Sequence, residues 1–305
     1  MIKNIGVIFT SIFFESLPFL LLGAFISALI ETFISNEKIV KLIPKNKVLG
    51  SIVGVFLGFF LPACDCAVIP ISKRLLKKKV PINVAISFML ASPIINPVVL
   101  LSTYYAFYNT EPKIFWFRLL FGILIALIIG TIMGIIYNKK NVTTNNSDEE
   151  DIECLECECD HCHHEHENKF MSVIKHTALD FFDVVKYLMF GALLASLVQV
   201  LLPRDILLIF NNNNILSILV LMIFAYLISL CSTSDSFVGK SLLSSFGQSS
   251  ILAYLLLGPM IDIKNTIVLL GNYKKKFVFT LIGLIFITIF IFSVLVVNIL
   301  WERNT

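Results

Sequence analysis

The feature that most constrains this chain is a set of long, predominantly apolar runs. Six of them approach or exceed the ~20 residues that a helix needs to cross about 30 Å of hydrocarbon. They cover residues 5–33, 81–108, 115–137, 177–202, 250–272 and 277–300. The composition agrees, because 57% of the residues are hydrophobic and 15% are charged, unlike a soluble globular protein. We therefore predict an all-α, polytopic membrane helix bundle.

The first apolar run should be a permanent span. It is too long for a cleaved signal peptide, and it ends at Glu31 without the small residues of a cleavage site. We expect no targeting segment to be removed.

Three short patterns occur twice along the chain, in the same order. The matching segments pair 15–29 with 183–197, 61–66 with 231–236, and 91–97 with 257–263. The second pair aligns Asp65 with Asp235, and the third aligns Asn96 with Asp262. The offsets between the copies stay between 166 and 170 residues. Three ordered matches at a nearly constant offset predict an internal duplication.

The duplication divides the chain into three parts. Residues 1–140 form the first membrane repeat and residues 170–305 form the second. Residues 141–169, between them, are polar, acidic and poor in apolar side chains, so they should be a solvated linker.

Two shorter apolar runs, 49–63 and 215–231, decide how the halves face. If both cross fully there are eight spans, with about 12 basic residues on one face and about 10 on the other. If both segments dip into the membrane and return on the same side, with bends at 62–70 and 232–239, the basic residues divide unequally. About 16 of them then lie on one face of the membrane, and about 6, including Arg118, lie on the other. The positive-inside rule favours the second arrangement. We predict an inverted repeat of three spans plus a re-entrant or broken helix per half, with the linker in the cytosol; eight full spans are the alternative.

Helix interruptions inside the spans indicate a cavity. Pro93 and Pro97 lie near the middle of one span, where each removes a backbone donor and forces the helix to open. Irregular backbone at membrane depth is tolerated only beside protein or water, and half-helix ends carry partial charge toward a solute. The residues that we expect to line a solute or proton path are Glu15, Cys64, Asp65, Cys66, Asn96, Cys231, Ser234, Asp235, Ser236 and Asp262.

Other interpretations of these side chains stay open. The acids could cap half-helices or pair with Lys240 and Lys264 instead of lining a path. Asp183, three residues before Lys186, is expected to form a local ion pair, whereas its counterpart Glu15 is a candidate for proton coupling.

The three membrane thiols also allow two interpretations. Cys64, Cys66 and Cys231 could form a soft ligand set for a thiophilic solute. Alternatively, each could be a small apolar filler, as buried cysteines commonly are.

The linker carries a separate cluster of metal ligands. Four thiols and four imidazoles fall within thirteen residues: Cys154, Cys157, Cys159, His161, Cys162, His163, His164 and His166. This set is sufficient for one tetrahedral zinc site and a further soft-metal site, or for a loose metal buffer. The membrane portion is expected to require no cofactor.

At these motifs the sequence resembles the predicted permease family that includes YraQ and the ArsP-type exporters of trivalent organoarsenicals. The resemblance lies in residues 61–70, 80–97, 231–237 and 258–265, so it covers nearly the whole membrane portion and not the linker. It implies a permease of the cytoplasmic membrane that acts with a second membrane subunit. Asp65 stands between two cysteines where the arsenical exporters tend to have serine, so the chain is more similar to the uncharacterised permeases.

The function that these features favour is secondary transport of a small solute, with a thiophilic metal, metalloid or organoarsenical as candidate solutes. No phosphate-binding loop occurs in the sequence, and we expect no enzyme activity. The expected partners are the lipid bilayer, the solute and a second membrane subunit, with no nucleic acid, in a bacterial cytoplasmic membrane. The rivals are a metal-responsive membrane scaffold and a membrane thiol oxidoreductase.

Overall fold

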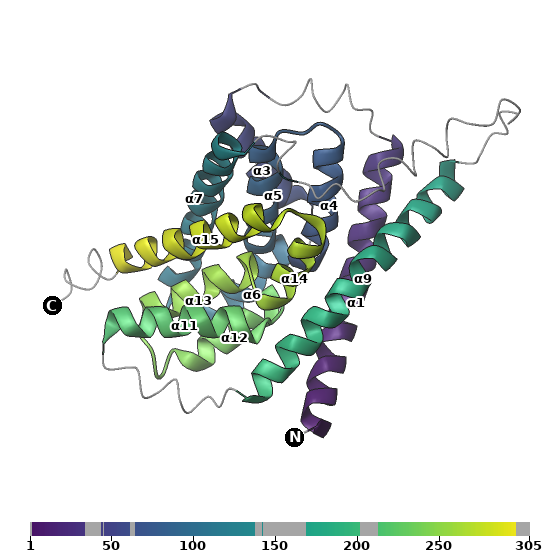
Figure 1. Cartoon of the computed structure of the whole chain (residues 1–305). Coiled ribbons are helices and arrows are strands. Elements are labelled where there is room, and N and C mark those ends of the chain that lie inside the picture. Colours follow the sequence, from purple (N-terminus) through teal and green to yellow (C-terminus); the bar gives the residue numbers. More distant parts are fainter. Residues whose placement is uncertain are drawn as a thin grey trace, which may run out of the picture.

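The computed structural model describes residues 2–33, 44, 46–61, 65–137, 142, 169–201 and 213–296. All regular elements in these ranges are α-helices (Figure 1). Six helical segments are long and apolar enough to cross a membrane: Lys3–Leu29, Ile82–Phe107, Pro112–Ile136, Val173–Leu201, Gln248–Asn272 and Lys275–Leu295. The all-α fold class and the six predicted spans are confirmed.

The helices follow the same order in the two halves of the chain. The first half contains α1 (Ile2–Phe33), α3 (Lys47–Phe60), α4 (Asp65–Lys77), α5 (Ile82–Ile95), α6 (Pro97–Phe107) and α7 (Pro112–Ile136). The second contains α9 (Lys169–Leu201), α11 (Asn214–Ile228), α12 (Ser232–Leu242), α13 (Gln248–Met260), α14 (Ile263–Asn272) and α15 (Lys275–Val296). A long helix, four shorter helices and a second long helix thus occur twice. An inverted relation between the halves stays a prediction.

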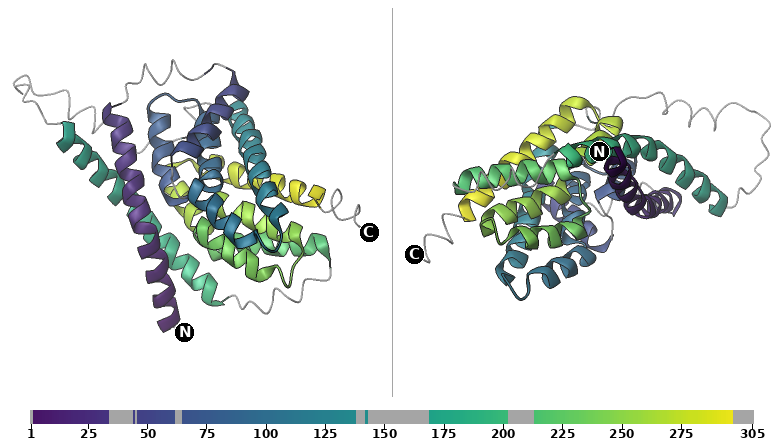
Figure 2. Two further views of the ribbon diagram at one scale, coloured as in Figure 1. Left: turned by 180° about the vertical axis from the view of Figure 1, so that it is seen from behind. Right: turned by 90° about the horizontal axis from the view of Figure 1, so that it is seen from below.

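The two shorter apolar runs became helices that are too short to span. α3 has 14 residues and α11 has 15, which correspond to about 21–23 Å at 1.5 Å per residue, less than the hydrocarbon thickness. In Figures 1 and 2 the connection from α4 to α5 lies at the same end of the molecule as the start of α3. This arrangement fits a segment that dips in and returns, and re-entry itself stays a prediction.

The core of the bundle is built on α5 and α13. All of α5 is buried, and so is α13 from Ser249 onward. α3 and α7 pack on α5, whereas α11 and α15 pack on α13 and run across the first group (Figure 1). Small residues allow this closeness, because a Cβ on Gly54 would strike the carbonyl oxygen of Val84 and one on Gly130 would strike Ser87 Oγ.

The two long helices α1 and α9 cross each other on one side of the remaining bundle (Figure 2). α1 packs on α4, and α9 packs on α14. A Cβ on Gly23 would lie 2.5 Å from Ala67 Cβ, and one on Gly191 would lie 3.0 Å from Lys264 Cα. Gly23 and Gly191, which the repeat aligns at an offset of 168 residues, therefore each mark a point where a long helix closely approaches the bundle.

Candidate functional site

Where the structure describes the chain, each half contains one helix break within a span, at Asn96 and at Asp262. The bends predicted within 62–70 and 232–239 are wrong in their position over the described residues, because the chain is helical from Asp65, through Pro70, and from Ser232 onward.

α5 ends at Ile95, and Asn96 has non-helical backbone (φ −54°, ψ 129°) before α6 begins at Pro97. The side chain of Asn96 caps α6 by accepting a hydrogen bond from the N–H of Val98 at 3.0 Å. Pro93 stays inside α5, so the helix opens at Asn96 only.

The matching break in the second half uses Asp262. This residue has extended backbone between α13 and α14, and its Oδ1 accepts a hydrogen bond from the N–H of Asn265 at 2.6 Å. Asn96 and Asp262, aligned by the repeat, thus make the same N-cap. The capping interpretation of the acids is confirmed for Asp262, and Asn96, for which no cap was predicted, caps α6 in the same way.

A buried cation lies beside the second break, and we call the group around it the lysine centre: Asp65, Asp262 and Lys264. Lys264 Nζ is 3.6 Å from Asp65 Oδ2 and 3.7 Å from Asp262 Oδ2. The three side chains are 2%, 0% and 3% exposed, in the order Asp65, Asp262, Lys264. Ser232 Oγ, on α12, donates to Asp65 Oδ1 at 3.5 Å. The centre therefore joins α4 of the first half to α12 and α14 of the second.

The carboxylates of the lysine centre keep spare acceptor capacity. Asp65 Oδ2 and Asp262 Oδ2 accept no hydrogen bond from the residues that the structure describes. Ser229, at the end of α11, has a left-handed backbone (φ 55°) and accepts from the N–H of Lys264 at 3.4 Å. Strained, non-glycine backbone of this kind is often found at functional sites. The centre therefore contains two buried carboxylate oxygens that accept no hydrogen bond from the described residues.

Two of the predicted thiols lie near this centre. Cys66 follows Asp65 and is buried, and Cys231 is partly buried. Cys231 directly precedes Ser232, which donates to Asp65, and neither thiol forms a disulfide. Cys64 lies outside the described residues.

A second polar group, which we call the arginine centre, forms around Asp235, Arg118 and Tyr254. Tyr254 OH donates to Asp235 Oδ1 at 2.9 Å. Arg118 Nη1 donates to Ser236 Oγ at 2.8 Å and to Thr103 Oγ1 at 2.5 Å. Asp235 is 2% exposed and Arg118 is 1% exposed. Helices α6, α7, α12 and α13 each contribute a side chain.

The prediction that Arg118 is a loop cation of one membrane face is wrong, because Arg118 lies inside α7 and its side chain is completely buried. The signal was available, because an ionisable residue inside an apolar run is a functional-site candidate by default. For Tyr254 no such signal exists, since its hydroxyl only acquires a role through contact with Asp235.

The remaining predicted residues occupy different places. Glu15 is exposed on α1, and Ser234 Oγ donates to its Oε1 at 3.5 Å. The expected local pair between Asp183 and Lys186 is present at 2.9 Å, with both side chains more than half exposed. Lys240 is exposed, so of the two lysines considered as partners for the acids, Lys264 is the one that pairs.

The predicted metal ligands of the linker all lie outside the described residues: Cys154, Cys157, Cys159, His161, Cys162, His163, His164 and His166. In the described part of the chain no group of three or more His, Cys, Asp or Glu side chains is arranged to hold a metal ion.

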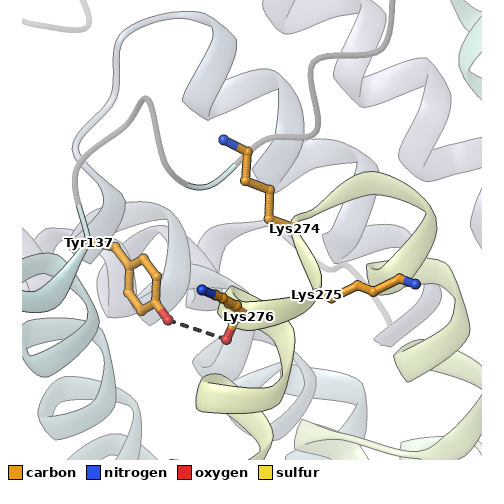
Figure 3. A pocket seen from close by; sticks show the side chains of 4 residues that line it. All are labelled: Tyr137, Lys274, Lys275 and Lys276. Atoms are coloured by element: carbon orange, nitrogen blue, oxygen red, sulfur yellow. Dashed lines mark hydrogen bonds between the residues drawn. The ribbon is translucent and has the colours of Figure 1, made fainter.

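An open pocket of about 420 Å³ lies elsewhere, where α7 ends and α15 begins. Its lining consists of Tyr137, Lys274, Lys275 and Lys276 (Figure 3). Tyr137 OH donates to the carbonyl oxygen of Lys276 at 3.2 Å. The pocket contains none of the residues predicted for the path, so the two buried centres are the better candidates for chemistry.

Comparisons with known proteins point to one class. A family model described as "Predicted permease" matches residues 1–298. A Streptococcus mutans protein, provisionally named as a two-component membrane permease complex subunit, is 38% identical over 292 residues, 95% of this chain and 93% of that protein. The UPF0718 protein YcgR of Bacillus subtilis is 39% identical over 289 residues, 95% of each chain. No solved structure matches.

Proposed function

The chain belongs to this family of predicted permeases, and we propose that it moves a small solute through the lysine centre by secondary transport. It is a multi-pass protein of the bacterial cell membrane, as its six apolar spans and its bacterial relatives indicate. The proposal concerns the path and the class of solute.

The observation that carries the proposal is a lysine held between two buried carboxylates at breaks in the helices. Burying three charged groups costs several kcal/mol per ion, and their mutual attraction offsets this only in part. Charged residues within membrane spans commonly mark solute paths or proton relays. The loose distances of 3.6 and 3.7 Å support an arrangement that can open.

The chemistry of the centre favours a cationic or thiophilic solute. With all groups charged, two carboxylates outnumber one ammonium group. In this proposal Lys264 occupies the site in the resting state, and an entering cation repels its ammonium group and takes its place beside Asp65 and Asp262. Protonation of either carboxylate would release the cation, which couples transport to the proton gradient. Cys66 adds a soft sulfur ligand for metals or metalloids.

Two further elements belong to the proposal. The name of the Streptococcus mutans relative supports assembly of this chain with a second membrane subunit. The thiols and imidazoles of residues 154–166 are proposed to bind zinc or another soft metal outside the membrane.

The test is flux through the purified chain in liposomes, with a panel of divalent metal cations, metalloids and trivalent organoarsenicals. Asp262→Asn and Asp65→Asn should each lower the flux of the carried solute at least tenfold, whereas Lys240→Met, at an exposed position, should not. Cys66→Ser should reduce flux only for thiophilic solutes. Flux in both Asn variants equal to that of the unmodified protein would exclude the lysine centre from the path.

A rival function remains distinguishable in the same experiment. A membrane thiol oxidoreductase would carry no solute and would lose its activity in Cys66→Ser but not in Asp262→Asn. A metal-responsive scaffold would show no flux and would respond only to deletion of residues 150–168.

A further inference from the structure

The guanidinium group of Arg118 is anchored on one side only. Its Nη1 donates to the hydroxyls of Thr103 and Ser236. Its Nε and Nη2 are buried, and they donate to no atom of the residues described in the structure. Leaving buried donors of a charged group without acceptors is energetically unfavourable, because their hydration is lost and not replaced. Some group that is not part of these residues should therefore satisfy them.

Arg74 shows which group binds the Nε and Nη2 edge of an arginine when that edge is occupied. Arg74 Nε donates to Asp180 Oδ2 at 2.9 Å, and Arg74 Nη2 donates to Asp180 Oδ1 at 2.6 Å. The Nε and Nη2 hydrogens point in parallel and match the two oxygens of a carboxylate or an oxoanion. The same two atoms are the ones left without acceptors in Arg118.

Asp235 does not fill the open edge of Arg118. The two side chains attract each other electrostatically, but Asp235 Oδ1 accepts from Tyr254 and its Oδ2 accepts no hydrogen bond within the described ranges. The carboxylate also lies against α13, because a Cβ on Gly258 would be 2.7 Å from Asp235 Oδ2. Asp235 balances the charge of Arg118 without occupying its donors.

Arg118 lies near the start of a span and is enclosed by protein. It lies six residues after Pro112, the first residue of α7, or about 9 Å along the helix axis, and its side chain is 1% exposed. Ser102, which hydrogen bonds with Ser236 at 3.3 Å, is only partly buried. The arginine centre thus adjoins a partly exposed residue near the start of a span.

From this geometry we infer that the Nε and Nη2 edge of Arg118 binds a small anion with two parallel oxygens, a carboxylate or an oxoanion such as phosphate. Thr103 and Ser236 hold the guanidinium in orientation, and the ligand completes its hydrogen bonds. The site is separate from the lysine centre and does not depend on the proposed transport. The phosphate group can come from solution or from a lipid headgroup.

The experiment measures thermal unfolding of the purified full chain in a maltoside detergent. Sodium phosphate, sulfate or acetate replaces chloride at constant ionic strength, and a second series adds phosphatidylglycerol or a phosphate-free glycolipid. We expect a saturable rise in unfolding temperature with at least one of the anions or with phosphatidylglycerol, and none with the glycolipid. A response to the phospholipid alone identifies the headgroup as the ligand.

The variants separate binding from fold. Arg118→Lys keeps the charge but loses the parallel donors, so the apparent affinity should fall about tenfold or more. Arg74→Lys is the matched control and should keep the response, because its fork is occupied by Asp180. Asp235→Asn should strengthen binding by removing a competing negative charge. If Arg118→Lys does not fold, Ser236→Ala, which removes one of the two hydroxyls that hold Nη1 in orientation, should weaken binding instead.

Two outcomes would overturn the inference. One is an unmodified protein that responds to neither the anions nor the phospholipid. The other is an anion response in Arg118→Lys, or in Ser236→Ala where that variant replaces it, that equals the response of the unmodified protein. Either result would leave water as the occupant of the Arg118 edge.

Discussion

Asp65, at the start of α4, lies beside Lys264, which also lies beside Asp262. Its counterpart Asp235, near the start of α12, accepts a hydrogen bond from Tyr254 and has Arg118 nearby. The lysine centre holds two acids and one base, whereas the arginine centre holds one of each. Within the part of the chain that the structure describes, the first has carboxylate oxygens that accept no hydrogen bond, and the second has arginine donors and one acid oxygen without a hydrogen-bond partner. Under the two proposals made above, matching positions of a duplicated chain have acquired opposite preferences, one for cations and one for anions.

The difference arises from residues that the repeat does not share. Lys264 is the second residue of α14, and the offset of 166 residues places Val98 at the equivalent position of α6. Val98 is 58% exposed and brings no charge to the arginine centre. The cation there comes instead from α7, through Arg118.

The largest expected effect comes from removing the shared cation. Lys264→Met leaves Asp65 and Asp262 buried without a counter-charge, which should destabilise the protein by about 3–5 kcal/mol. The measurement is thermal unfolding in detergent, with Lys240→Met as the exposed control. The double variant Lys264→Met with Asp65→Asn should recover part of the loss. Equal stability of Lys264→Met and Lys240→Met would remove the claim that the lysine centre is charged.

A smaller effect is expected from crowding the arginine centre. An alanine at Gly258 would push against Asp235 Oδ2, 2.7 Å from the new Cβ, and overpacking of this kind costs about 1–3 kcal/mol. Gly283→Ala is the matched control, since no described atom lies within 4 Å of its Cβ position. It should be neutral or stabilising by up to about 1 kcal/mol. A Gly258→Ala protein as stable as the Gly283→Ala protein would show that Asp235 can move freely.

The substitutions Arg74→Lys and Arg118→Lys should destabilise the protein to different extents. Arg74→Lys breaks a two-bond contact with Asp180 between α4 and α9 and should cost about 1.5 kcal/mol, because hydrogen bonds to charged groups contribute about 1.5–3 kcal/mol. Arg118→Lys, measured without added anion, should cost less than Arg74→Lys, since no described group is bonded to its open edge. A larger loss for Arg118→Lys would indicate an occupant that stays bound during purification.

The smallest effect is expected at the exposed pair on α9. Asp183→Asn breaks the contact with Lys186, in which both side chains are more than half exposed. Exposed pairs of this kind contribute about 0–1 kcal/mol, so the unfolding temperature should stay within about 2 °C of that of the unmodified protein. A loss comparable with that of Lys264→Met would mean that this pair is buried by a partner.

The helix breaks are features that can be predicted from residues close together in the sequence. Asn96 before Pro97, and Asp262 three residues before Asn265, could be recognised in the sequence because an N-cap depends on residue types a few positions apart. The six spans could also be predicted from the sequence, since the length of an apolar run has to match the thickness of the bilayer. The capping of both half-helices followed from the same local rules.

The partners of the buried charges could not be found in this way. Asp65 and Lys264 are about 200 residues apart in the chain, and Arg118 meets Ser236 across the two halves. A sequence indicates that an intramembrane charge needs a partner, but it does not say which one. The contact between α1 and α9 could not be predicted from the sequence either. The repeat shows that the two helices are equivalent, but not that they pack against each other on one side of the bundle.

Hydrophobic length, helix-breaking residues and the duplicated order of acids therefore depend on the chain alone, because each acts through the bilayer or through its immediate neighbours. The pairing of two acids with one lysine, and the half-satisfied arginine opposite them, arose only when helices from both halves packed together. Charge pairing inside a membrane acts over a few ångströms in space, whatever the separation along the chain.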